Sequence, residues 1–86
     1  MPKTSMEILT TKMSDEMQRE VLQVALLAVN MYTKDNDIAT NIKKEFERKH
    51  GGTWHCIIGS SGYNVKLKCY INVSVGDKDI LLFRTD

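Results

Sequence analysis

The stretch Thr53-Trp54-His55-Cys56-Ile57-Ile58-Gly59 marks the point at which the character of the sequence changes. Before it, apolar residues recur with helical spacing, and after it they recur at every second position, as they do in strands. Its own aromatic and β-branched side chains favour a strand. We therefore expect it to be the first strand of a C-terminal sheet and the hinge between a helical half and a β half.

Two helices are expected before this stretch, over residues 15–32 and 36–50. Ser14 stands where an N-cap is needed, and acidic residues follow it in the first turn. The first helix is apolar around most of its circumference, which is typical of a helix buried on two sides. The second has a narrow apolar stripe and a charged outer side, so it is expected to cover one side of the core. One face of the first helix carries Met17, Val21, Val24, Ala28 and Met31.

The remaining sequence predicts a sheet built mostly from the C-terminal half. Alternation from Tyr63 to Val75 is too long for one strand, since strands average about 5–6 residues, and we divide it near Lys68-Cys69. Gly76-Asp77 suits the centre of a two-residue type II′ hairpin. The predicted strands cover residues 7–11, 53–59, 62–67, 69–75 and 79–84. The fold class is therefore α+β, with two N-terminal helices packed on a C-terminal antiparallel sheet in one domain, residues 1–86.

Length and composition limit the kinds of protein that this chain can be. It has 86 residues, so its single core is marginal, and a second subunit is the expected support. The net charge of +1 argues against nucleic acid or an anionic membrane as a partner. There is no apolar run of about 18 residues, and the two cysteines have neither disulfide nor metal-site spacing. We expect a cytoplasmic protein without a metal or other cofactor.

Catalysis is not expected, because no motif supports it. His55 and Cys56 are adjacent, and adjacent side chains of a strand point to opposite faces, so they cannot form a nucleophilic pair. A phosphate loop, a dinucleotide fingerprint and a paired-carboxylate motif are all missing from the sequence. A binding role is more plausible, since the alternating segment Tyr63 to Lys68 ends in lysines as edge strands do. Such an edge could accept a strand from a sister subunit or from an extended peptide, or pair within the chain. These alternatives remain open at this point.

Five blocks of sequence, in the same order and spacing, resemble the dynein light chain family over essentially the whole chain. The resemblance implies a non-catalytic, symmetric homodimer in which each sheet borrows a strand, here about Gly62 to Lys66, from the other subunit. The blocks are Met13-Ser14-Asp15-Glu16-Met17-Gln18, Asp37-Ile38-Ala39, Ile42-Lys43-Lys44-Glu45-Phe46, Thr53-Trp54-His55-Cys56-Ile57 and Ile80-Leu81-Leu82-Phe83.

The resemblance also implies which residues join the two subunits. His55 matches a family histidine that is buried at the dimer interface and whose protonation separates the dimer. Burying an imidazolium in an apolar interface is costly, which agrees with this role. The implied interface residues are Trp54, His55, Gly62, Tyr63, Asn64 and Val65.

By the same resemblance, the dimer binds extended peptides of partner proteins such as dynein intermediate chain, often with a Gln-Thr core. The peptide adds as an extra strand in a groove between the borrowed strand and the second helix. This implies a cytoplasmic hub of the dynein motor complex, associated with the cytoskeleton. The implied groove residues are Thr10, Asp35, Asn36, Ser61, Gly62, Tyr63, Asn64, Val65, Lys66, Asn72 and Ser74.

The sequence departs from the family pattern at this groove. The segment between Gly59 and Tyr70 is a few residues shorter, and the family's charged pair at the start of the second helix becomes Asp35 and Asn36, without its lysine. Two groove tyrosines become Asn72 and Ser74. The alternative function is therefore a dimerisation domain of a larger EF-hand calcium-binding protein, its groove altered or lost. Some tegumental proteins of parasitic worms carry such a light-chain-like domain.

Overall fold

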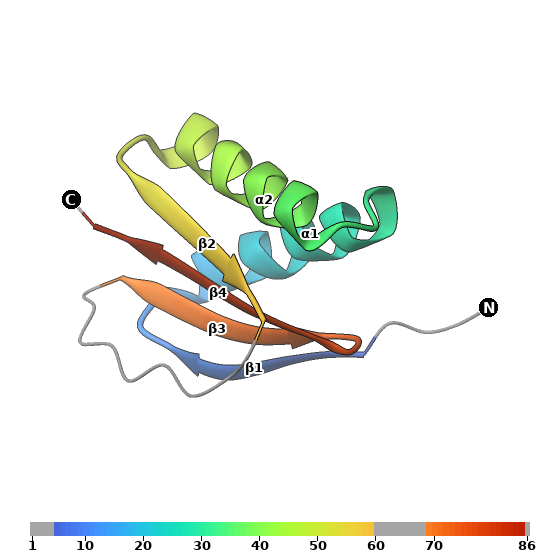
Figure 1. Ribbon diagram of the computed structural model, residues 1–86. Coiled ribbons are helices and arrows are strands. Elements are labelled where there is room, and N and C mark those ends of the chain that lie inside the picture. The colour runs from blue at the N-terminus through green and yellow to red at the C-terminus, as the bar shows by residue number, and fades with distance from the viewer. Residues whose placement is uncertain (1–4, 60–68, 86) are drawn as a thin grey trace.

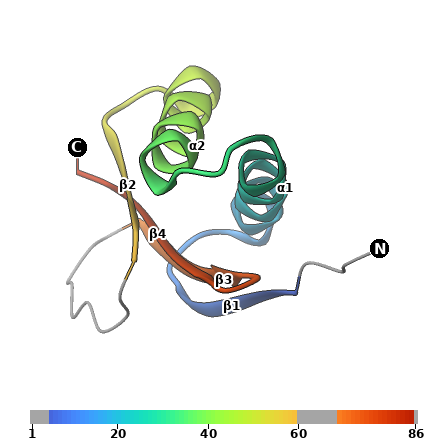
Figure 2. The same ribbon diagram turned by 45° about the vertical axis from the view of Figure 1, so that its right-hand side comes forward.

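The computed structural model describes residues 5–59 and 69–85, which form two helices on a four-stranded antiparallel sheet. The two helices lie side by side on the same face of the sheet (Figures 1 and 2). This confirms the predicted α+β class. The elements in chain order are β1 (Met6–Thr11), α1 (Asp15–Met31), α2 (Asp35–His50), β2 (Trp54–Ile58), β3 (Tyr70–Val75) and β4 (Lys78–Arg84).

Each of these elements begins and ends within one residue of its predicted bounds. The strand predicted at 62–67 lies outside the described residues. Gly76 and Asp77 form the two-residue loop between β3 and β4, since Val75 and Lys78 on either side of them are paired. Gly76 has φ +63°, and among the described residues no residue other than glycine has a positive φ. A positive φ at the first loop residue, Gly76, but not at the second, Asp77, is typical of the type II′ turn expected from the sequence.

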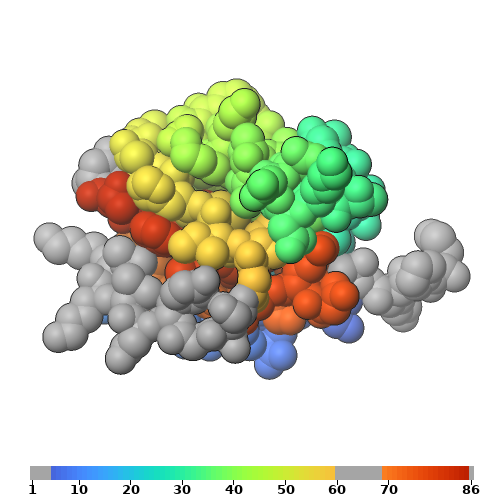
Figure 3. Space-filling view, in the orientation of Figure 1, coloured from blue at the N-terminus to red at the C-terminus, as the bar shows by residue number. Residues whose placement is uncertain are grey.

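The sheet has the strand order β1-β3-β4-β2, with all described pairs antiparallel. β1 therefore forms one edge and β2 the other, so the hinge strand pairs on one side only within the described part of the chain. β2 reaches the surface beside α2 in the space-filling view (Figure 3). Another strand could extend the sheet at the β2 edge.

The core lies between the helices and the sheet and is centred on Trp54. Trp54 is fully buried, and its ring meets Phe46 of α2 edge-on at 5.1 Å between centroids. Its Nε1 donates a hydrogen bond to the Gly51 carbonyl oxygen at 2.9 Å. This residue therefore fastens the hinge strand to the end of α2. The other large, fully buried side chains are Val21, Ile38, Ile42, Ile71, Val73, Val75, Ile80 and Leu82.

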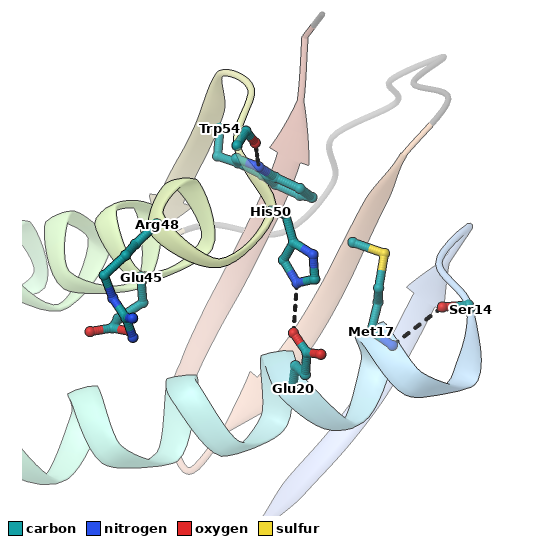
Figure 4. A network of polar contacts seen from close by, with 8 residues as sticks. Ser14, Met17, Glu20, Glu45, Arg48, His50 and Trp54 are labelled. Atoms are coloured by element: carbon teal, nitrogen blue, oxygen red, sulfur yellow. Dashed lines mark hydrogen bonds and ion pairs between the residues drawn. The ribbon is translucent and has the colours of Figure 1, made fainter.

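The two helices run antiparallel, and a contact between His50 and Glu20 joins them. His50 Nε2 at the end of α2 lies 2.6 Å from Glu20 Oε2 of α1 (Figure 4). The His50 ring also packs on Phe46, with 5.3 Å between ring centroids. As expected, α1 packs on two sides, against β3 of the sheet and against α2. Leu27 and Met31 are nevertheless 59% and 65% exposed, because α2 lies beside α1 on the sheet and not over it (Figure 2).

Ser14 caps α1 as predicted. Its Oγ accepts a hydrogen bond from the Met17 backbone N–H at 3.3 Å (Figure 4). We expect Ser14→Ala to lower the free energy of unfolding by about 1 kcal/mol, the usual cost of losing an N-cap. Urea unfolding followed by circular dichroism measures this. Ser5→Ala, outside the helices, is the control, and equal losses in both variants would contradict the capping role.

Candidate functional site

An apolar strip lies on the sheet face opposite the helices, next to the edge of β2 that no other described strand pairs with. His55 pairs with Phe83 across β2 and β4, and their rings stack with centroids 5.2 Å apart. Ile57, two residues along β2, shares this face because side chains alternate, and it is 37% exposed. We call His55, Ile57 and Phe83 the outer strip. A second molecule could cover it while pairing with β2.

Trp54 cannot contribute its side chain to a subunit interface, although the resemblance implied that it would. It precedes His55 in β2, so strand alternation sends the indole to the helix-covered face while His55 faces outward. The indole has no exposed surface. Of the implied interface residues, His55 alone lies on the outer strip. Gly62, Tyr63, Asn64 and Val65 lie outside the described residues.

The structure brings together only some of the implied groove residues. Thr10 of β1 pairs with Asn72 of β3, and Ser74 lies two residues farther along the same face of β3. Asp35 and Asn36 begin α2, in the other layer of the fold. Within one subunit these two groups therefore face different sides of the sheet. Ser61, Gly62, Tyr63, Asn64, Val65 and Lys66 lie outside the described residues.

Lys78 is a residue of this region that the sequence analysis missed. Its Nζ lies 2.7 Å from Asp35 Oδ1, so the start of β4 is tied to the start of α2. The hydrogen bond to Asp35 raises the pKa of Lys78 above its ordinary value. A cation therefore stands beside Asp35, although position 36 holds asparagine. Lys78 shares the helix-covered face with Ile80 and Leu82, and this alternation was its only signal in the sequence.

The thiols offer no activated nucleophile. Burial raises the pKa of Cys56 from 9.0 to about 12. Burial also raises the pKa of Cys69, and the positive charge of Arg84 partly opposes that shift. Within residues 5–59 and 69–85, no cluster of three or more histidine, cysteine or acidic side chains could hold a metal ion. In the same part of the chain, no helix has the length and hydropathy needed to span a bilayer.

These pKa shifts predict unequal alkylation of the two cysteines. At pH 8 a thiol of pKa about 12 is ionised in about one molecule in ten thousand, and the thiolate is the reactive form. We expect iodoacetamide to modify Cys69 in the folded protein well before Cys56, with the rates converging in urea. Peptide mapping by mass spectrometry measures both rates. Equal rates in the folded protein would contradict the burial of Cys56.

A model of the family described as dynein light chain type 1 matches residues 5–85, nearly the whole chain. The chain belongs to the dynein light chain family. It is 39% identical over 82 residues to the cytoplasmic dynein light chain of Emericella nidulans, covering 92% of this chain and 87% of that protein. It is 38% identical over 76 residues to a dynein light chain of Schistosoma mansoni, covering 85% of each.

A solved structure leads to the same family. The dynein light chain-like domain of the Fasciola hepatica calcium binding protein FhCaBP2 superposes with a TM-score of 0.82 at 25% identity. The match covers 98% of this chain and 94% of that domain. The resemblance found in the sequence is therefore confirmed, both for the light chains and for a light-chain-like domain of a calcium-binding protein.

Proposed function

We propose that this protein is a non-catalytic, dimeric light chain that holds extended segments of partner proteins by strand addition. The observation that carries the proposal is the edge of β2 beside the outer strip, which is unpaired among residues 5–59 and 69–85. Its proposed setting is the dynein motor complex in the cytoplasm, in association with the cytoskeleton. A related protein whose name includes "cytoplasmic" supports that compartment. Nucleic acid and membrane are not proposed as partners.

The composition of β2 favours pairing with a second copy. Exposed sheet edges are normally protected by lysine, proline or a bulge. β2 has the sequence WHCII, which contains neither lysine nor proline, and its pairing with β4 has no bulge. The opposite edge, β1, has a register shift between Ile8 and Thr10 and carries Glu7. β2 is thus the edge suited to a partner strand, which the family relation suggests is about residues 62–66 of a second subunit.

A dimer would also resolve the division of the groove residues between two faces. One peptide site could be lined by both subunits, with Asp35 and Lys78 from one and Asn72 and Ser74 from the other. Two such sites would be related by the two-fold axis. Each dimer would then hold two copies of a partner, so that modest single contacts add up through avidity. Dynein intermediate chain, with a Gln-Thr-core peptide, is the proposed ligand.

The role of Lys78 can be tested with a fluorescent Gln-Thr-core peptide. We expect Lys78→Gln to weaken peptide binding about fivefold, because it removes a charged contact at the rim of the site. Fluorescence anisotropy measures the affinity, and sedimentation checks that the dimer is unchanged. Lys44→Gln, on the exposed side of α2, is the matched control. No loss in Lys78→Gln, or an equal loss in the control, would contradict the role of Lys78.

The structural match favours one alternative function. The matched domain belongs to a calcium-binding protein, and the groove of this chain has polar Asn72 and Ser74 in place of aromatic side chains. The alternative is a dimerisation domain of a larger EF-hand protein with an altered or lost groove. A clean dimer that does not bind the Gln-Thr-core peptide would favour it. Saturable micromolar binding would favour the light-chain function.

A further inference from the structure

The helical side of the molecule has an apolar surface that the proposed dimer does not use. Leu27 and Met31 lie one turn apart on α1, and both are more than half exposed. The outer strip is on the opposite face of the sheet, and β2 would pair with a second subunit along its free edge. A second subunit bound there would leave Leu27 and Met31 uncovered.

These two side chains line a groove of about 240 Å³ between α1 and α2. Val24, only 6% exposed, lies deeper on the same side of α1. Apart from Gln23, the α1 wall of the groove is apolar, and the groove has space for side chains from another molecule. Its second wall, from α2, is polar and charged.

The charges of the α2 wall favour an acidic partner. Arg48 binds Glu45 with 2.7 Å between Nη2 and Oε2, so the single negative charge on this wall is already balanced (Figure 4). Lys49 also lines the groove, and among the described residues it forms no ion pair. The groove thus has a net positive charge next to apolar Leu27 and Met31.

The walls also restrict the form of the partner. Both are helices, whose backbone groups are bonded internally, so a peptide cannot add here as a strand. The described residues that line the groove include no aromatic side chain, as proline-rich ligands would require. A third helix can pack into the furrow between two antiparallel helices by fitting its side chains between theirs. Apolar residues at i and i+4 on such a helix would meet Leu27 and Met31.

We propose that the groove between α1 and α2 binds an amphipathic helix of a partner protein, with large apolar residues flanked by acidic ones. This contact is independent of strand addition at β2. A dimer could therefore hold extended peptides at one surface and a helical segment at another.

The test uses the full chain, labelled with ¹⁵N, and two designed helical peptides of about 18 residues. Both peptides carry leucines along one stripe, and the flanking residues are glutamates in one and lysines in the other. We expect chemical shift changes centred on Leu27 and Met31, with the glutamate peptide binding about tenfold more tightly. Equal affinities, no binding, or shifts centred elsewhere would overturn the proposal.

Variants locate the contact. We expect Leu27→Glu to lower the affinity for the glutamate peptide at least about tenfold, and Lys49→Glu to lower it about threefold. Leu9→Gln removes an exposed leucine from β1 and should change nothing. An equal loss with Leu9→Gln would show nonspecific apolar binding and would overturn the proposal. Sedimentation of Leu27→Glu completes the test. If this variant had a lower mass in solution than the unmodified protein, the groove would bind a second copy of the chain, and the proposal would be overturned.

Discussion

Trp54→Ala is expected to unfold the subunit or bring it close to unfolding. The change removes a fully buried indole, its contact with Phe46 and its hydrogen bond to Gly51. Truncating a large aromatic residue in a core costs about 3–5 kcal/mol, and small domains have only about 5–15 kcal/mol of stability. Urea unfolding at a fixed protein concentration measures the loss. The concentration is fixed because the proposed dimerisation would stabilise the folded chain.

Ile57→Ala is the informative comparison for Trp54→Ala, because the two residues lie on opposite faces of β2. Ile57 is partly exposed on the outer strip, so its truncation should have little effect on the folded subunit. It should instead weaken the dimer. If Trp54→Ala unfolded at the same urea concentration as Ile57→Ala, the assignment of Trp54 to the core would be wrong.

His55→Lys is expected to convert the proposed dimer to a folded monomer. The substitution puts a permanent positive charge on the outer strip beside Phe83, where the ring of His55 now stacks. Burying an unpaired charge in an apolar interface costs several kcal/mol, so the dimer should weaken at least about 100-fold. Sedimentation velocity measures the mass, and circular dichroism verifies the fold.

His50→Lys is the matched control, because it makes the same chemical change at the helical side of the molecule. There the new ammonium group can still pair with Glu20, and the proposed interface is not affected. The control should remain a dimer. If the His55→Lys protein sedimented with the same dimer mass as the unmodified protein, the position of His55 at the interface would be contradicted.

Periodicity predicted most of the fold, because helices and strands are local and their buried faces repeat at fixed intervals. The same periodicity overestimated the burial of α1. It identifies apolar positions, but it does not show what covers them, so Met31 was assigned to the buried face of the helix although it is 65% exposed in one subunit.

The candidate site was harder to predict, for two physical reasons. Trp54 and His55 were both assigned to the interface by resemblance. The alternation rule that separates His55 from Cys56 also places Trp54 on the face opposite His55. Lys78 and Asp35 are 43 residues apart in the chain, so no local pattern could indicate their ion pair. Only the packing of the β3–β4 hairpin under the start of α2 brings them together.

Sedimentation equilibrium of the unmodified chain at neutral pH tests the central claim most directly. If β2 and the outer strip join two copies, the measured mass will be twice that of the chain throughout the micromolar range. Adding a saturating Gln-Thr-core peptide will increase the mass by two peptides per dimer. A single-chain mass at all these concentrations, with or without the peptide, would contradict the proposed dimeric light chain.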